Sequence, residues 1–263
     1  MMSMDRHVAP VLGAPCWVSL TARDLTAAQD FYGAVMNWSF RTASFGDAFC
    51  VALADDQPVA GIAEVAPGWQ APVDWTPYFA VADADDVAGR VRERGATVAV
   101  GPLRLGYGRA ALAADRDGAR FGLWEGQSLS WTVGEGNAPA LLELRTRDAF
   151  DAAIFYAQIF DWATPESECR VDYEEEQVIV RQGDRAVATL RGGGVESAPD
   201  PRIRPRWHVH FRVRDLDKTT AAAVAAGGTV TPVVEPAGGA AGPRAVIRDP
   251  DGALFTVSTG DGP

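Results

Sequence analysis

The chain has 263 residues, and its 24 Lys and Arg against 35 Asp and Glu give a net charge of −11. An acidic chain is poorly suited to attract nucleic acid or an anionic membrane, so we expect neither as a partner. With 47% hydrophobic residues the composition is globular, and the three cysteines lack the C-x-x-C spacing of a zinc site or disulfide framework. Without a signal-like N-terminus or an apolar run of ~18 residues, we expect a cytoplasmic protein.

The first predicted elements are a strand and a helix. Val18 and Leu20 alternate with polar residues, which is the period of a strand with one covered face. Asp24 or Thr26 can cap the following helix, whose apolar residues fall on one face. Two short strands are expected next, near residues 48–54 and 59–65, so the first segment predicts a β-α-β-β-β repeat.

The same order of elements recurs from Thr76. Here Gly95 is expected to end the helix, and residues 115–118 to form a tight turn before the last strand at 119–125. The segment 126–139, rich in Gly and ending in Pro, is expected to connect the two halves of the chain.

The second half then repeats the first. Residues 17–38 align without gaps to residues 141–162, and Asp115-Arg-Asp-Gly-Ala matches Asp249-Pro-Asp-Gly-Ala. We therefore predict two similar domains, residues 10–127 and 136–260. The predicted class is α+β, with four β-α-β-β-β repeats forming two curled eight-stranded sheets, one per half.

These strand, Asp and helix patterns, closed by a D-P-D-G hairpin, resemble the vicinal oxygen chelate superfamily of glyoxalases, bleomycin-resistance proteins and extradiol dioxygenases. The chain is most similar to its tandem two-domain actinobacterial members. The resemblance implies two cup-shaped sheets, a small-molecule ligand or substrate, and metal ligands on the opening and closing strands. A monomer or a homodimer is expected, because two halves in one chain can supply the pairing that single-domain relatives obtain by dimerisation.

Most positions that the resemblance assigns to metal ligands hold residues that do not usually bind metals. In the first half they hold Trp17, Thr76 and Gly122, which cannot bind a divalent ion together. In the second half they hold Leu141, His208 and Thr256, and only the histidine is an ordinary ligand. We therefore expect no metal and no other cofactor. A displaced set of Glu143, His208 and His210 remains an alternative, since two histidines and a carboxylate can hold iron or zinc.

The inward faces of the two predicted sheets differ in chemistry. The first is expected to bind a flat or apolar compound through aromatic walls and a few polar groups, namely Trp17, Ser19, Thr76, Tyr78, Arg120 and Trp124. The second gathers acids, bases and cations, namely Glu143, Arg145, His208, His210, Arg212 and Thr256. A salt-bridged structural network is the alternative interpretation of this second group.

Three functions remain open. The first is a metal-independent enzyme of small-molecule or secondary metabolism, such as a cyclase, isomerase or lyase, with His208, His210 and Glu143 as catalytic residues. In that hypothesis Arg145, Arg212 and Thr256 join the first-sheet residues in binding an aromatic or polycyclic substrate. The second is a non-catalytic protein that binds a small molecule such as an antibiotic. The third is a metal-dependent enzyme similar to a glyoxalase or dioxygenase.

Overall fold

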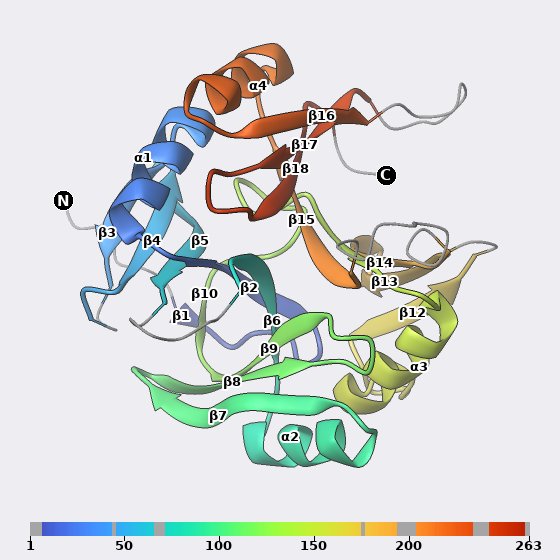
Figure 1. Cartoon of the computed structure of the whole chain (residues 1–263). Helices are drawn as coiled ribbons and strands as arrows, with labels where there is room; N and C mark the ends of the chain where they lie inside the picture. Colours follow the sequence, from blue (N-terminus) through green and yellow to red (C-terminus); the bar gives the residue numbers. More distant parts are fainter. Residues whose placement is uncertain are drawn as a thin grey trace. The chain divides into compact units, whose positions relative to one another are not determined.

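The computed structural model describes residues 7–43, 46–65, 72–174, 177–193, 204–233 and 242–260. Four β-α-β-β-β repeats account for most of them, as predicted (Figure 1). Repeat 1 consists of β2 (Pro15–Ala22), α1 (Leu25–Met36), β3 (Ser39–Thr42), β4 (Phe49–Ala54) and β5 (Gln57–Glu64). Repeat 2 consists of β6 (Asp74–Ala80), α2 (Ala84–Glu93), β7 (Thr97–Leu105), β8 (Gly108–Ala114) and β9 (Arg120–Gly126).

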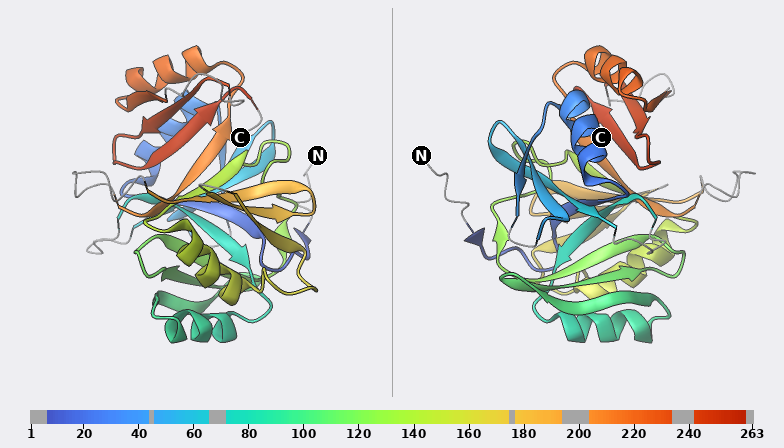
Figure 2. Two further views of the ribbon diagram at one scale, coloured as in Figure 1. Left: turned by 90° about the vertical axis from the view of Figure 1, so that its right-hand side faces the viewer. Right: turned by 60° about the vertical axis from the view of Figure 1, so that its left-hand side comes forward.

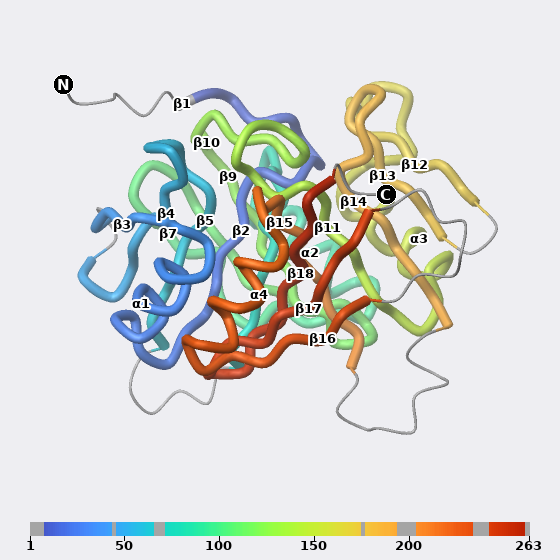
Figure 3. The backbone as a smooth tube through the Cα atoms, turned by 90° about the horizontal axis from the view of Figure 1, so that it is seen from above, coloured from blue at the N-terminus to red at the C-terminus, as the bar shows by residue number. Residues whose placement is uncertain are grey.

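The second half follows the same order. Repeat 3 consists of β11 (Leu141–Arg145), α3 (Ala149–Phe160), β12 (Cys169–Tyr173), β13 (Gln177–Gln182) and β14 (Arg185–Arg191). Repeat 4 consists of β15 (Arg206–Arg212), α4 (Leu216–Ala225), β16 (Thr229–Val233), β17 (Arg244–Arg248) and β18 (Leu254–Ser258). Two further short strands, β1 (His7–Val8) and β10 (Ser128–Leu129), pair with each other; β10 lies in the segment expected to connect the halves (Figure 3).

The strands form two mixed eight-stranded sheets, which confirms the predicted fold class. Their strand orders are β3-β4-β5-β2-β6-β9-β8-β7 and β12-β13-β14-β11-β15-β18-β17-β16. Within each repeat the opening strand pairs in parallel with the last one, as β2 does with β5 and β11 with β14. Among the described residues, no helix is long and apolar enough to cross a membrane.

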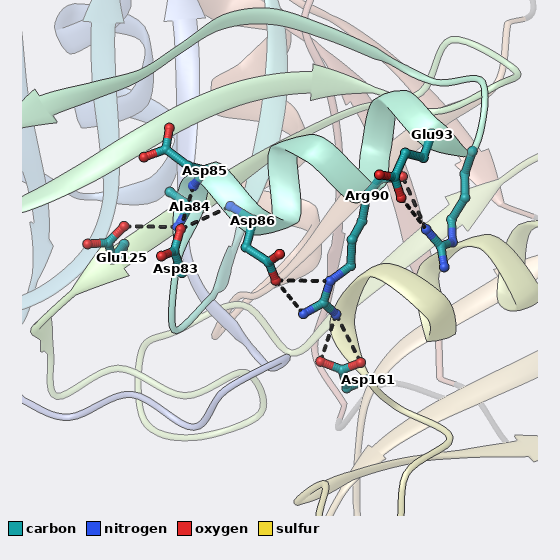
Figure 4. Close-up of polar contacts among 9 residues, drawn as sticks. Asp83, Ala84, Asp85, Asp86, Arg90, Glu93, Glu125 and Asp161 are labelled. Atoms are coloured by element: carbon teal, nitrogen blue, oxygen red, sulfur yellow. Dashed lines mark hydrogen bonds and ion pairs between the residues drawn. The ribbon is translucent and has the colours of Figure 1, made fainter.

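Each of the four helices begins directly after an aspartate with extended backbone, namely Asp24, Asp83, Asp148 and Asp215. The carboxylate accepts hydrogen bonds from the first free backbone N–H groups of its helix, which would otherwise have no partner. Asp83, for example, accepts from the amides of Asp85 and Asp86, both at 2.9 Å (Figure 4). In the first helix the cap is Asp24 rather than Thr26. Gly95, with φ of +77°, follows the second helix as predicted.

The described chain clusters into two compact units that do not follow its two halves. Compact unit 1 contains residues 1–17, 77–133 and 142–207, and compact unit 2 contains residues 18–76, 134–141 and 208–263. Repeats 2 and 3 thus pack together in unit 1, and repeats 1 and 4 in unit 2, where α1 and α4 lie side by side (Figure 2). The domain boundaries at 10–127 and 136–260 stay a prediction.

A buried Tyr-Asp-Trp network occurs once in each compact unit. In unit 1 the Tyr156 hydroxyl donates to Asp115 Oδ2 at 3.0 Å and accepts from Trp207 Nε1 at 3.1 Å. In unit 2 the Tyr32 hydroxyl donates to Asp249 Oδ2 at 3.0 Å and accepts from Trp75 Nε1 at 3.2 Å. Both aspartates lie in the predicted tight turns. Each network therefore ties a turn of one half to a helix of the other.

Polar contacts on the surface of compact unit 1 join the same two repeats. Arg90 on α2 binds both oxygens of Asp161, which follows α3, at 2.8 and 3.0 Å, and also binds Asp86 (Figure 4). Arg94 Nε donates to Gln158 Oε1 at 2.8 Å. These contacts hold the two helices at a defined register.

Candidate functional site

Two aromatic side chains of the first sheet lie over glycines on one face of repeat 2. Tyr78 on β6 is paired with Gly122 on β9, and a Cβ atom at Gly122 would clash with the Tyr78 ring. Likewise, a Cβ atom at Gly108 on β8 would come within 2.6 Å of the Trp124 ring. Only glycine leaves room for rings in these positions. We call Tyr78, Trp124, Gly108 and Gly122 the aromatic platform.

The platform is apolar and partly exposed. Trp124 is half-buried, and its indole Nε1 donates to the carbonyl of Gln127 at 3.0 Å. Loss of water around the hydroxyl raises the pKa of Tyr78 to about 12, although part of its side chain stays exposed. The positive charge of Arg120, on the same strand as Trp124, opposes this rise in pKa. A flat apolar compound would find here rings, small residues and one cation.

The other residues predicted for the first inward face are divided between the compact units. Trp17 belongs to unit 1, where its ring packs on Trp131 with centroids 5.8 Å apart. Ser19 and Thr76 belong to unit 2 and are 8% and 3% exposed. The structure thus brings Tyr78, Arg120 and Trp124 onto one face of one unit, whereas the grouping of all six residues stays a prediction.

In the second sheet, Glu143 on β11 is buried, with its side chain 2% exposed, and it is held by arginine. Arg145 Nε donates to Glu143 Oε1 at 2.6 Å, and Arg191 Nε on β14 lies 3.9 Å from Glu143 Oε2. A hydrogen bond between two charged groups at this distance is among the stronger polar contacts of a protein. The contact with Arg145 supports the salt-bridged interpretation for this part of the predicted group.

The two predicted histidines lie on β15 in compact unit 2, whereas Glu143 lies in unit 1. His208 is half-buried and His210 is 6% exposed. His210 is paired with Thr256 on β18, and Arg212 with Ser258, so these side chains leave the sheet on one face. The structure therefore brings His208, His210, Arg212 and Thr256 onto one strand face, and the grouping of the histidines with Glu143 stays a prediction.

Several residues on these faces were missed by the sequence analysis. Gly108 was not singled out, and Gly122 was considered only as a failed ligand position. On β14, Thr189 and Arg191 are paired with Glu143 and Arg145. Strand alternation predicts that Thr189 and Arg191 share one face of β14. The local sequence pattern does not predict that β14 pairs with β11.

Comparisons of the chain with known proteins identify its family. Residues 14–123 match the model of the Glyoxalase/Bleomycin resistance protein/Dioxygenase superfamily, and residues 142–258 match a glyoxalase-like domain. "Putative glyoxylase CFP32" of Mycobacterium tuberculosis is 32% identical over 93% of this chain and 94% of its own length. The chain belongs to the glyoxalase/bleomycin resistance protein/dioxygenase superfamily. The resemblance found in the sequence is thereby confirmed.

Other relatives of this superfamily member extend the comparison. "Anthracycline biosynthesis protein DnrV" of Streptomyces peucetius is 33% identical over 93% of this chain and 92% of its own length. Among solved structures, the Mn(II)-bound glyoxalase from Novosphingobium aromaticivorans covers 95% of this chain and 84% of its own, with a TM-score of 0.58 and 14% identity. A catechol 2,3-dioxygenase covers 97% and 90%, with a TM-score of 0.60 and 14% identity. At these identities the structures support the fold alone.

A divalent metal, which the resemblance to the family implies for the opening and closing strands, does not fit the face that carries the histidines. In register with His210 stand Thr256 and Val246, and the next row holds Arg212 and Arg244. Guanidinium groups repel a divalent cation, and this face contributes no carboxylate from β15 to β18. Within the described ranges, no group of three or more His, Cys, Asp and Glu side chains is placed to hold an ion.

Proposed function

We propose that this superfamily member is a metal-independent enzyme of small-molecule metabolism that acts on an aromatic or polycyclic substrate. The reaction class is acid-base chemistry of the cyclase, isomerase or lyase type. The aromatic platform is the observation that carries the substrate class, because Tyr78 and Trp124 present ring faces over glycines. The name of the Streptomyces relative, an anthracycline biosynthesis protein, supports a polycyclic compound of secondary metabolism.

The proton transfer is assigned to His208 or His210. Histidine is the side chain whose ordinary pKa lies near neutrality, so it can give and take a proton at physiological pH. The neighbouring Arg212 would stabilise a negative charge that develops when a carbon or hydroxyl group loses its proton. Glu143 was predicted as the third catalytic residue. Because it is bound by Arg145, we assign it only an electrostatic influence on the histidines and no proton transfer of its own.

A protein that binds its ligand without converting it is the second candidate. The observation that favours it is the same Arg145 contact, which removes the one buried carboxylate predicted to support the histidines. Binding would then rest on the platform alone, and the histidines would line the second sheet without exchanging protons with a substrate.

The binding part is tested with a hydroxyanthraquinone, which is flat, polycyclic and uncharged. We expect quenching of tryptophan fluorescence on binding, and a loss of about 1 to 3 kcal/mol of binding free energy in Trp124→Ala, because that ring face is covered by the ligand. Tyr173→Ala is the matched control, since Tyr173 is 56% exposed and lies in repeat 3. Equal affinities in the wild type and both variants would contradict the platform.

The catalytic part is tested with a bicyclic ketone, 2-tetralone, in D2O. Acid-base catalysis would speed exchange of its α protons for deuterium, measured by mass spectrometry. We expect slower exchange in His208→Ala or His210→Ala, with unchanged hydroxyanthraquinone binding. No acceleration by the wild type, or full acceleration in both variants, would remove the catalytic assignment and leave the binding protein as the function.

A further inference from the structure

Two arginines of compact unit 1 stand side by side on the second sheet. Arg145 ends β11 and Arg191 ends β14, and the two are direct partners in the parallel pairing of these strands. Paired residues leave a sheet on the same face, so both guanidinium groups lie on the face that carries Glu143. We propose that Arg145 and Arg191, the arginine fork, bind a carboxylate group of a small-molecule ligand. This inference rests on the proposed small-molecule function and adds a charged group to its ligand.

Each guanidinium is oriented through one nitrogen. Arg145 Nε donates to Glu143 Oε1 at 2.6 Å, and Arg191 Nε donates to Gln177 Oε1 at 3.0 Å. Within the part of the chain that the structure describes, the terminal Nη groups of both residues donate no hydrogen bond to a protein acceptor. Their side chains are 54% and 39% exposed. The fork therefore presents fixed donors toward solvent, as planar recognition of a carboxylate requires.

The floor beside the fork is built from buried polar groups. Glu143 precedes Arg145 by two residues, and its register partner on β14 is Thr189. Thr189 is 3% exposed, and its hydroxyl has no hydrogen-bond partner among the described residues. A buried hydroxyl without a partner costs stability in the free protein. A ligand oxygen or a water held between Thr189 and the fork would satisfy it.

The charge of the cluster favours a monoanion. Counted over these three side chains alone, two guanidinium groups and one carboxylate, Glu143, give 2 − 1 = +1, which one ligand carboxylate neutralises. A phosphate monoester with two negative charges would leave an excess charge near the buried Glu143. Arg181 on the neighbouring strand β13 offers no such site, because its Nε binds Asp172 at 2.7 Å and its Nη1 donates to the carbonyl of Asp184.

The test compares three ligands of one shape, 1-naphthoate, 1-naphthyl phosphate and 1-naphthylmethanol, by calorimetry on the full chain. We expect naphthoate to bind more tightly than the uncharged alcohol, and its affinity to fall with salt. In Arg191→Gln and Arg145→Gln we expect about tenfold or greater loss for naphthoate and little change for the alcohol. Arg181→Gln is the matched control and should bind all three as the wild type does.

A second variant, at Glu143, tests whether the net charge around the fork sets the preference for a monoanion. Glu143→Gln keeps a hydrogen-bond acceptor for Arg145 but changes the cluster from +1 to +2, so we expect the preference to shift from naphthoate toward naphthyl phosphate. A merely structural role of Glu143 would weaken both ligands alike. If Arg145→Gln fails to fold because Glu143 is left unpaired, the double variant Arg145→Gln/Glu143→Gln replaces it.

Equal affinities of the wild type for naphthoate and naphthylmethanol would overturn the proposal that the fork binds a carboxylate. So would equal losses in the fork variants and in Arg181→Gln. Because the hydroxyanthraquinone is uncharged and its test varies Trp124, failure of the fork leaves that binding intact. Failure of the platform is seen with the hydroxyanthraquinone and with naphthylmethanol, which carries no charge, whereas failure of the fork is seen in naphthoate relative to naphthylmethanol.

Discussion

The two compact units share the same buried Tyr-Asp-Trp network but differ in the residues on their sheet faces. Tyr156 and Tyr32 make equivalent buried bonds, each 3.0 Å to an aspartate, and each accepts a tryptophan N–H at 3.1 or 3.2 Å. On the sheet faces, unit 1 carries the aromatic platform and the arginine fork, whereas unit 2 carries two histidines with Arg212.

The comparison indicates which residues of the repeats are constrained by packing, namely those of the buried networks. The aspartate of each network also accepts two backbone N–H groups of its own turn, as Asp115 does from Asp117 and Ala119. Replacing any member would leave a buried polar group unpaired in a packed core. Among the described residues, the sheet faces that carry the platform, the fork and the histidines have no polar network common to both units, and there the residue types differ.

The largest effect is expected from removing the tyrosine hydroxyls. Tyr156→Phe and Tyr32→Phe each remove the hydroxyl that donates to the aspartate Oδ2 and accepts from a buried indole N–H, and each should lower the free energy of unfolding by about 2 to 3 kcal/mol. Denaturant unfolding measures it, with Tyr173→Phe at an exposed position as the control. A large loss in one variant and none in the other would break the equivalence of the two networks.

A smaller effect is expected on the face that differs. Gly122→Ala places a methyl group against the Tyr78 ring and should cost about 1 to 2 kcal/mol of stability. The displaced phenol should regain water, so its pKa should fall from about 12 toward its ordinary 10, seen by ultraviolet titration. Gly89→Ala in α2, where an added methyl meets nothing within 4 Å, should instead stabilise by about 0.5 to 1 kcal/mol. An unchanged titration in Gly122→Ala would contradict the platform geometry.

The aspartates of the networks give a pH dependence. Burial raises the pKa of both Asp115 and Asp249 above 3.8, although backbone amides and the tyrosines oppose the rise. As pH falls from 7 toward 4, the folded state takes up these protons before the unfolded chain does, so the aspartates contribute more stability at lower pH. The free energy of unfolding of the wild type minus that of Asp115→Asn or Asp249→Asn should therefore increase as pH falls. If this difference in the free energy of unfolding does not change with pH, the hydrogen bonds to the aspartates fully cancel the rise in pKa caused by burial.

The smallest effects are expected at surface ion pairs. Arg90, which binds Asp86 and Asp161 and is 29% exposed, should contribute about 0.5 to 1 kcal/mol to unit 1. Arg214 pairs with Asp55 in unit 2 but is 87% exposed, so Arg214→Ala should change the stability little. Thermal unfolding of Arg90→Ala and Arg214→Ala at low and high salt compares them. A salt-insensitive Arg90→Ala would indicate that its aliphatic stem, rather than its charge, matters.

The sequence by itself determined the repeats and their local structure. Gly95 follows α2 with positive φ and Asp115 closes a tight turn, whereas the cap of α1 was narrowed only to Asp24 or Thr26. These features depend on a few neighbouring residues, whose side chains and backbone settle their own conformation. The stripe of Phe31 and Tyr32 on α1 was likewise readable, because helical period places residues on one face.

Only the tertiary structure decided which repeats share a core and which side chains meet on a sheet face. Tyr32 and Asp249 are 217 residues apart along the chain, and Arg145 meets Arg191 through strand pairing. Alternation along a strand tells which residues share a face but not which strand lies beside it. The platform also depends on glycines that make room for rings from other strands, and that fit exists only once the sheet has formed.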